Sequence, residues 1–403
     1  MRLLYLCYLD VREPLVQNQV LPYLRQLAAD GNEVHLLTFD SRDAKARTGE
    51  EVAAEKNRFS QDGINWTFLT YHKRPSAPAT LYDILAGAAK TVRLVRRYKI
   101  DVLHARAHIA LAMALLAQRW TRSRLVFDLR GLVAEEYADA GIWKENSRPF
   151  RAIKKIERAG LVRADEIIVL SERFRDWLVE QRLATAGKIE VIPCCVDLKR
   201  FDDDSLTPPE GFEVIYAGSV VGLYLLEEMG RFFLALKQQR PDASFRVLTL
   251  TPRERVAEVF RRVGIDAADF HVTAVAPLEV AGLLQRARLG ITFRKPAFSQ
   301  IAASPTKIAE YLAAGLPVVS NSGTGDVDKI LETEGVGITV DTFDDRTLAA
   351  AATQALALAD KPGINRQCRM AARTHFDLIN VGGRGYRSVY QRIADRKNRS
   401  NDG

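Results

Sequence analysis

The stretch SPTKIAEYLAAGLPVV, which begins at Ser304, combines hydroxyl, ammonium and carboxylate groups at spacings that would bring them together. A helix starting here would have Ser304 as its N-cap and Pro305 at its first position. Thr306 and Lys307 add a hydroxyl and a positive charge to a first turn whose unpaired N–H groups attract anions. Glu310 would lie on the same face as Lys307 and could accept hydrogen bonds from a diol. The local pattern predicts either a diphosphate site or a well-capped helix with an exposed Lys–Glu pair.

Apolar strands on both sides would position this helix. Residues 289–293 are expected to form the preceding strand, whose carboxyl end would face the first turn of the helix. Gly315 supplies a left-handed cap, and Pro317 prevents the helix from continuing into the strand that follows. The candidate site therefore belongs to a strand–helix–strand unit.

The same alternation of strands and helices recurs along the chain and predicts an α/β protein with parallel sheets. The predicted strands of the first half are residues 3–8, 34–39, 66–71, 101–104, 125–128, 166–170 and 190–192. Those of the second half are 214–217, 246–249, 289–293, 316–320 and 337–340. One helix carrying Val16, Val20, Leu24 and Leu27 on one face is expected between the first two strands.

A Pro- and Asp-rich segment after Ile192 reads as a linker between two doubly wound domains. We expect an acceptor-binding domain over residues 1–200 and a nucleotide-binding domain over 211–372. A final helix over 375–396 would cross back to the first domain. Two such domains would leave a central cleft, faced by the carboxyl ends of their strands.

Composition restricts the class of protein. The 403 residues are 47% hydrophobic and 27% charged, which is typical of soluble globular proteins, and no apolar run is long enough to span a membrane. The first residues reach Asp10 and Arg12 too soon for a signal peptide. The four cysteines form neither a CxxC motif nor a disulfide framework. We expect a cytoplasmic protein.

Positive charge is concentrated in the first half of the chain. Residues 1–200 hold 33 Lys and Arg against 25 Asp and Glu, which accounts for the whole net charge of +8. Two segments with helical apolar spacing, Lys90–Lys99 and Arg148–Arg163, are each strongly basic. They are either solvated helix faces or a surface held against a polyanionic acceptor or against anionic lipid headgroups on the inner face of a membrane. Nucleic acid is not expected, because no recognised binding module accompanies the charge.

Taken together, these motifs resemble the GT-B glycosyltransferases of family 4. SPTKIAEYLAAGLPVV resembles the donor-binding signature of that family, and its Ser-Pro-Thr-Lys form resembles the bacterial polysaccharide and lipopolysaccharide members. IEVIPCCVDLKRF, VIYAGSV and RADEIIVLSE resemble the inter-domain motif, the Gly-rich turn of the nucleotide domain and the last strand region of the acceptor domain. The resemblance covers essentially the whole chain.

The resemblance implies a retaining transfer of a sugar from a UDP- or GDP-sugar, without a metal or other cofactor. Glu310 would bind the ribose of the nucleotide, and Arg294 would add a cation. Ser304, Thr306 and Lys307, at the start of the helix, would face the diphosphate. The turn that contains Gly218 and Ser219 would approach it from the other side. Pro305 would shape that first turn.

Three departures from the family pattern stand out. Ala302 occupies the position where the family commonly has a second glutamate that contacts the donor sugar. The turn after Gly218 lacks the Arg and Lys that usually meet the diphosphate. The first turn of the acceptor domain, which contains Asp10, reads LDVREP where Gly-Gly is common. These features are expected to mark a subfamily.

On the acceptor side, candidate residues follow two predicted strands. Arg106 stands where many relatives have a functional histidine, and His108 is an alternative proton acceptor or a structural residue. Asp128, Arg130 and Glu135 follow the next strand and are either acceptor-side groups or structural ones. Arg106, His108 and Arg130 are the catalytic candidates, and Asp10, Asp128 and Glu135 are candidates for contact with the acceptor.

The predicted function is transfer of a hexose or related sugar to a glycan or lipid-linked glycan. Two alternatives stay open: a sugar-nucleotide 2-epimerase on the same scaffold, and a non-catalytic binding subunit of the same fold.

Overall fold

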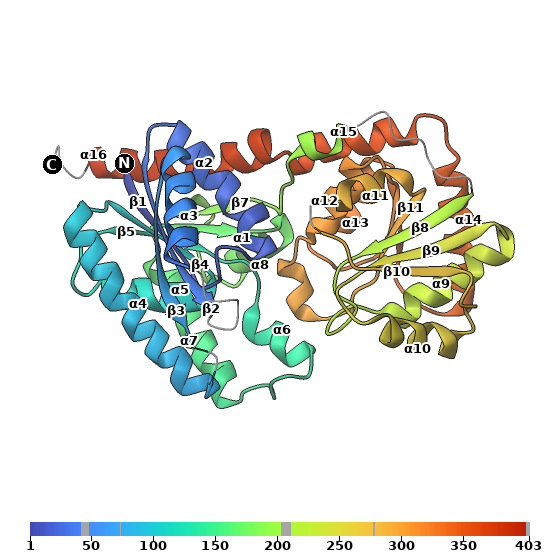
Figure 1. Ribbon diagram of the computed structural model, residues 1–403, viewed down its shortest axis with the longest axis horizontal. Coiled ribbons are helices and arrows are strands. Elements are labelled where there is room, and N and C mark those ends of the chain that lie inside the picture. Colours follow the sequence, from blue (N-terminus) through green and yellow to red (C-terminus); the bar gives the residue numbers. More distant parts are fainter. Residues whose placement is uncertain (42–47, 73, 203–210, 277–278, 400–403) are drawn as a thin grey trace. The chain divides into compact units, whose positions relative to one another are not determined.

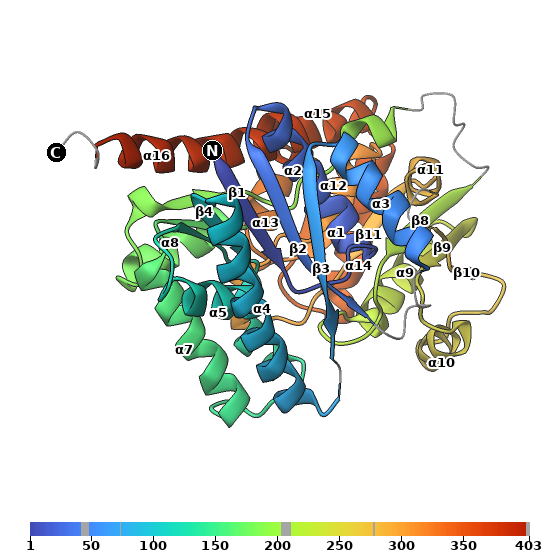
Figure 2. The same cartoon turned by 60° about the vertical axis from the view of Figure 1, so that its left-hand side comes forward.

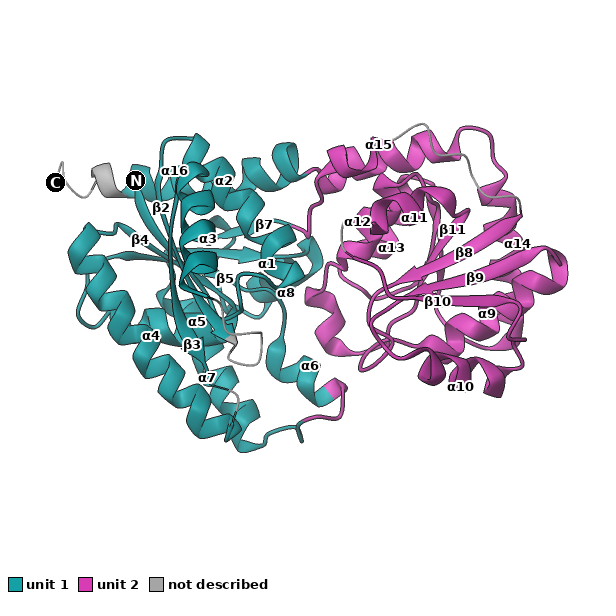
Figure 3. Ribbon diagram, in the orientation of Figure 1, with its two compact units in different colours: residues 1–138, 143–192, 378–403 teal, residues 139–142, 193–377 magenta. Residues whose placement is uncertain are grey.

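A computed structural model describes residues 1–41, 48–72, 74–202, 211–276, 279–399 of the chain. By internal contacts the chain divides into two units (Figure 3). Unit 1 comprises residues 1–138, 143–192 and 378–403, and unit 2 comprises 139–142 and 193–377. The two units divide between Ile192 and Pro193, where the predicted linker begins.

Unit 1 is built on a sheet of seven parallel strands in the order β3-β2-β1-β4-β5-β6-β7. The strands are β1 Arg2–Cys7, β2 Glu33–Ser41, β3 Ile64–Tyr71, β4 Val102–Arg106, β5 Arg124–Asp128, β6 Glu166–Val169 and β7 Ile189–Val191. The sequence order reverses between β1 and β4, so the carboxyl ends of these two strands form a topological switch point. The register places Leu4 opposite His35 on β2 and Leu103 on β4.

Helices cover both faces of this sheet (Figure 1). On one face α4 and α7 both pack against α5 (Figure 2). The helices of unit 1 are α1 Pro14–Gln19, α2 Leu21–Ala29, α3 Gly49–Gln61, α4 Ser76–Tyr98, α5 Ala107–Ala117, α6 Val133–Asp139, α7 Arg148–Arg163, α8 Glu172–Glu180 and α16 Arg384–Arg399. A π-helical turn, Leu378–Gly383, leads into α16 and packs on α2.

The prediction of a single helix between β1 and β2 is wrong, because the structure has two helices, α1 and α2, in that segment. α1 ends at Gln19 and α2 begins at Leu21, with Val20 in a non-helical conformation between them. Pro22 explains the break, since proline has no N–H to donate and is tolerated only in the first turn of a helix.

Unit 2 repeats the architecture with six parallel strands in the order β10-β9-β8-β11-β12-β13. The strands are β8 Phe212–Ala217, β9 Ala243–Leu248, β10 Phe270–Thr273, β11 Leu289–Thr292, β12 Val318–Asn321 and β13 Gly337–Val340. Here the order reverses between β8 and β11. The α/β class with two doubly wound domains, predicted from the alternation of strands and helices, is confirmed.

Two apolar clusters hold the helices of unit 2 against opposite faces of its sheet. One contains α9 Leu226–Gln239, α10 Arg253–Val263 and α14 Asp345–Ala359. The other contains α11 Val280–Arg286, α12 Thr306–Ala313, α13 Val327–Thr333 and α15 Ile364–Phe376. Tyr311 of α12 is fully buried, and its ring lies so close to Gly290 of β11 that a Cβ there would be 2.5 Å from it. This contact fixes α12 tightly to the strand before it.

Candidate functional site

The switch point of unit 2 gathers the residues that were predicted to bind a donor. Gly218 follows the last residue of β8, and Arg294 follows β11 by two residues. The first turn of α12, with Thr306 and Lys307, reaches the same edge, because the Nζ of Lys307 lies beside Gly218. In open α/β sheets ligands bind at this point, outside the carboxyl ends of the strands.

Lys307 is buried, with 7% of its surface exposed. Its Nζ donates a hydrogen bond of 2.9 Å to the hydroxyl of Tyr216 and lies 4.1 Å from the centroid of that ring. The ring of Tyr224 also lies against the ammonium, with its centroid 3.9 Å from Nζ. Burial lowers the pKa of Lys307 well below its ordinary value, Arg294 acts in the same direction, and Glu310 opposes them. The ammonium of Lys307 is therefore confined by aromatic rings and has little contact with water.

Gly218 is needed where it stands. Its φ is +134°, a conformation that only glycine adopts readily, and a Cβ added there would be 2.9 Å from the Nζ of Lys307. The next residue, Ser219, accepts a short hydrogen bond from the hydroxyl of Tyr216 through its backbone carbonyl. The turn after β8 is thus connected to Lys307 through one tyrosine.

Arg294 forms the second cation of the site. Its guanidinium donates 2.5 Å to Oε1 of Gln300 and 3.1 Å to the hydroxyl of Tyr224. Its backbone N–H donates 2.7 Å to the side chain of Asn321. Because Tyr224 contacts both Arg294 and Lys307, it connects the two cations.

Glu310 is half-buried one helical turn beyond Lys307. Burial raises the pKa of its carboxyl, while the charges of Arg200 and Lys307 act in the opposite direction. Among the described residues, none forms a hydrogen bond or ion pair with this carboxylate. It therefore keeps its capacity to accept hydrogen bonds from a ligand.

The first turn of α12 differs from its predicted form. The helix begins at Thr306, Pro305 is the N-cap, and no side chain caps the free N–H groups. The hydroxyl of Ser304, predicted to be the cap, instead accepts a 3.1 Å hydrogen bond from the backbone N–H of Cys194. The N–H groups of the turn are thus left without a side-chain acceptor. Ala302, just upstream, is fully buried.

Unit 1 has a buried polar cluster centred on Asp128, at the end of β5. Oδ2 of this carboxylate accepts hydrogen bonds from the hydroxyl of Tyr5 at 3.2 Å and from the guanidinium of Arg106 at 3.3 Å. His104 Nε2 lies 3.6 Å from the same oxygen, and the Arg130 guanidinium lies 3.5 Å from Oδ1. Burial alone would raise the pKa of Asp128, but Arg130, His104 and Arg106 together hold it below its ordinary value.

The cluster is a closed array rather than an open pocket. Asp128 and His104 have no exposed surface, and burial lowers the pKa of His104. The side chain of Arg106 is 4% exposed and that of Arg130 is 10% exposed. Arg130 is therefore the most accessible of these charged groups. Directly after Arg106, Ala107 has a φ of +62°, which is unusual for a residue with a side chain.

The remaining acceptor-side candidates lie apart from this cluster. His108 is buried on α5, and its Nε2 is 3.0 Å from Glu157 of α7, which favours a structural role over that of a base. Glu135 of α6 pairs with Lys154 at 2.6 Å. Asp10, in the turn after β1, holds the guanidinium of Arg12 at 2.7 Å.

Two contributors to the candidate donor site were not predicted, namely Tyr216 and Tyr224. Tyr216 is the penultimate residue of β8, where a tyrosine reads as an ordinary core side chain. Tyr224 lies in the turn after Gly218, which stood out in the sequence only for the absence of an Arg and a Lys. An aromatic residue at each end of a Gly-containing turn, GSVVG, is the signal that would have pointed to a cation between them.

Within the ranges given above, no three His, Cys, Asp or Glu side chains gather closely enough to hold a metal ion. None of the helices over those ranges is both long and apolar enough to cross a membrane.

Comparison with known proteins places these observations in context. Residues 16–200 match the model of Glycosyltransferase Family 4. No curated protein matches the chain. A glycosyltransferase from Rickettsia africae shares 16% identity over 98% of each chain, with a TM-score of 0.70. Anabaena HepE in complex with UDP and glucose shares 16% over 97% of this chain and 99% of its own, with a TM-score of 0.68.

The fold is also similar to that of a protein assigned a different activity. A Listeria monocytogenes protein assigned as a UDP-N-acetylglucosamine 2-epimerase shares 13% identity over 96% of this chain and 94% of its own, with a TM-score of 0.59. At these identities the likeness establishes architecture alone. The chain thus has the GT-B fold, and its residues 16–200 match glycosyltransferase family 4.

Proposed function

We propose that the protein is a glycosyltransferase that binds a nucleotide-sugar at the switch point of unit 2. The observation that carries the proposal is the convergence of Lys307, Arg294 and Glu310 on the carboxyl ends of β8 and β11. Two cations and an uncapped helix N-terminus suit a diphosphate, and a carboxylate one turn further along suits a ribose diol. The match to a glycosyltransferase family and the UDP complexes of HepE support the choice of ligand.

In this proposal each residue has a distinct task. The N–H groups of Thr306 and Lys307 and the ammonium of Lys307 bind the diphosphate oxygens and stabilise the charge that develops when the sugar leaves. Gly218 and Ser219 lie on the other side, where the absence of a side chain at Gly218 lets a ligand approach the backbone. Glu310 accepts from the ribose hydroxyls. The reaction needs no metal in this proposal, because the cations and the helix end supply the positive charge.

The acceptor is proposed to bind unit 1. Arg130 is the best placed of the candidates to contact it, since it is the most exposed charged residue of the Asp128 cluster. Asp128 and His104 would act by holding the arginines in position. Retention of configuration and a glycan or lipid-linked acceptor belong to the proposal through the resemblance to family 4.

Nucleotide binding tests the donor site. Titration calorimetry with UDP and GDP should detect binding of at least one of them. Lys307→Met and Glu310→Gln, which keep side-chain volume, should each weaken it by about 1.5 kcal/mol or more, the scale of a charge-assisted hydrogen bond. Lys329→Ala and Glu332→Ala on α13 remove an exposed lysine and glutamate with the same spacing and should leave affinity unchanged.

The outcomes separate the alternatives. No binding of any nucleotide, or equal affinity in all four variants, would end the proposal of a donor site. If a bound nucleotide-sugar is isomerised in the absence of an acceptor, the protein is an epimerase. If it is bound but never consumed, with or without glycan acceptors, the protein is a binding subunit.

A further inference from the structure

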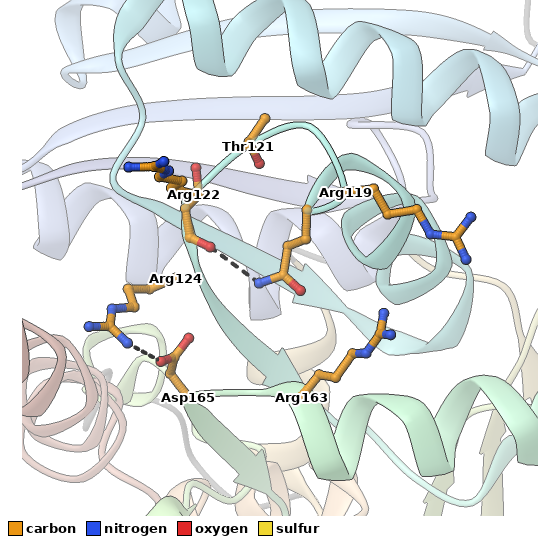
Figure 4. A pocket seen from close by; sticks show the side chains of 8 residues that line it. Arg119, Thr121, Arg122, Arg124, Arg163 and Asp165 are labelled. Carbon is orange, nitrogen blue, oxygen red and sulfur yellow. Dashed lines mark hydrogen bonds and ion pairs between the residues drawn. The ribbon is translucent and has the colours of Figure 1, made fainter.

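A second basic site lies in unit 1, at the edge of the sheet opposite to the switch point. A hollow of about 570 Å³ opens there beside the amino ends of β5 and β6 (Figure 4). Its walls are the loop that follows α5, the first residue of β5 and the end of α7. The residues that line it are Gln118, Arg119, Thr121, Arg122, Ser123, Arg124, Arg163 and Asp165.

The backbone of this hollow is held firmly by hydrogen bonds. The side chain of Gln118 donates 3.2 Å to the carbonyl of Ser123, and the hydroxyl of Ser123 donates 2.9 Å to the carbonyl of Ile100. The hydroxyl of Thr121 donates 3.2 Å to Ala117 at the end of α5. The loop therefore presents its arginines from a fixed frame.

Charge in the hollow is unbalanced. Four arginines face one carboxylate, Asp165, and both oxygens of that carboxylate are occupied. They accept 2.8 Å from Arg124 and 2.9 Å from the N–H of Leu125. Over the part of the chain that the structure describes, the guanidiniums of Arg119, Arg122 and Arg163 have no hydrogen-bond or ion-pair partner. Figure 4 shows their side chains around the hollow without dashed contacts.

We propose that this hollow binds a phosphate-bearing ligand. Four arginines around one carboxylate whose oxygens are both occupied leave a net positive charge at the hollow, and that charge attracts an anion. Arginine forms paired hydrogen bonds to phosphate oxygens, and more than one residue can share one phosphate group. The volume is within the range of small-molecule sites, so it can accept more than a single phosphate ion. The arginines could also serve to interact with the negative C-terminal ends of the α5 and α7 dipoles. One cation at each helix end would be enough for that role, so it does not explain all of them.

Two kinds of ligand carry such a phosphate group, a free phosphate compound and an anionic lipid headgroup. Trp120, between two of the arginines in sequence, is 59% exposed, and an exposed tryptophan beside arginines is typical of proteins at a lipid surface. The site is independent of the donor site, since it lies in the other unit and uses none of the same residues.

The test compares two double variants of the whole protein. Arg122→Ala with Arg163→Ala removes two free cations from the hollow, and Arg253→Ala with Arg261→Ala removes two exposed cations from α10 of unit 2. Each is titrated with inorganic pyrophosphate and sedimented with vesicles of phosphatidylcholine and phosphatidylglycerol in equal parts. Thermal unfolding of both variants checks that they remain folded. Lys307→Met is included because pyrophosphate also suits the donor site.

We expect the hollow variant alone to lose about tenfold or more in affinity for pyrophosphate or for the vesicles. A loss with pyrophosphate assigns the site to a free phosphate compound, and a loss with vesicles only assigns it to a lipid headgroup. The proposal is overturned if the hollow variant loses neither, or if the α10 variant loses as much. Pyrophosphate binding that depends on Lys307 alone, together with unchanged vesicle sedimentation of the hollow variant, would support the donor site and refute this one.

Discussion

Confinement gives Lys307 an unusual titration. The rings of Tyr216 and Tyr224, which both lie against its ammonium, replace water, and Arg294 adds a like charge nearby. Glu310 is the only group that favours the charged form among those found to affect Lys307, and the raised pKa of Tyr216 keeps that residue neutral. The free site therefore disfavours the charged form of its lysine and holds the pKa of Lys307 well below its ordinary value.

A bound diphosphate would reverse this balance. It stabilises the ammonium and so raises the pKa of Lys307, which means that binding takes up a proton when the pH lies between the free and bound pKa values. We expect UDP affinity to be highest below the free pKa and to fall as the pH rises toward the bound one. Calorimetry in buffers of different ionisation enthalpy measures the uptake directly.

Two variants of site residues serve as the test and the control for this prediction. Lys307→Met should abolish the uptake, whereas Glu310→Gln removes a carboxylate of raised pKa and should leave the lysine's proton uptake in place. An uptake that persists in Lys307→Met would assign the proton to another group.

At this scale the sequence predicts Lys307 and Glu310 as site residues from their positions in one helix, but it could not reveal their surroundings. The spacing within one helix is a local property, whereas Tyr216 and Tyr224 precede Lys307 in the chain by 91 and 83 residues. Ser304 shows the same limit. A serine before Pro-Thr predicts a cap, but the hydroxyl is taken by Cys194, a contact between distant segments.

At the scale of elements, α4 has an outward face that changes character along its length. Leu81, Leu85 and Ala89 are exposed and follow each other at intervals of four residues, and Arg93 and Arg97 continue the same row. The first two leucines are 58% and 55% exposed. An apolar row with a basic continuation suits the interface of an anionic membrane.

We therefore expect Leu81→Ser with Leu85→Ser to reduce sedimentation with phosphatidylglycerol vesicles by about tenfold, from the apolar area lost. Leu250→Ser with Met370→Ser, at exposed apolar positions of unit 2, is the matched control. Equal sedimentation of the two variants would contradict a membrane role for α4.

Most strands were predictable, because each is a short apolar run between helical patterns. β10 was missed, since only Phe270 of its four residues is buried and the strand lies at the edge of the sheet. The break between α1 and α2 was missed because the apolar spacing continues through it.

At the scale of the whole molecule, the last helix belongs to the first unit. Tyr386 of α16 stacks on Tyr23 of α2 at 4.5 Å and on His104 of β4 at 5.6 Å. Arg392 donates to the buried carboxylate of Glu166 and to Glu190. The turn before α16 fits closely, because a Cβ on Gly382 would lie 2.5 Å from the ring of Tyr23.

Gly382→Ala should therefore destabilise unit 1 by about 1–3 kcal/mol, the usual cost of forcing an atom into a packed core. Gly187→Ala is the control, since a Cβ there meets nothing within 4 Å, and its effect should stay within about 0.5 kcal/mol. Hydrogen exchange of amides in β1 and β4 measures the change, and equal exchange in the two variants would show that the turn is not closely packed.

The stack of Tyr23, His104 and Tyr386 also bears on how the chain is made. Two tyrosines of α16 also reach the Asp128 cluster, since the hydroxyl of Tyr386 donates 3.5 Å to Asp128 and that of Tyr390 lies 3.0 Å from Nδ1 of His104. Ribosomal synthesis proceeds from the N-terminus, so the cluster lacks both tyrosines until the final helix emerges. Every strand and helix of unit 2 precedes that helix in the chain. Unit 2 can thus complete its core during synthesis while unit 1 still lacks α16. The nascent first half must therefore stay soluble without its last helix.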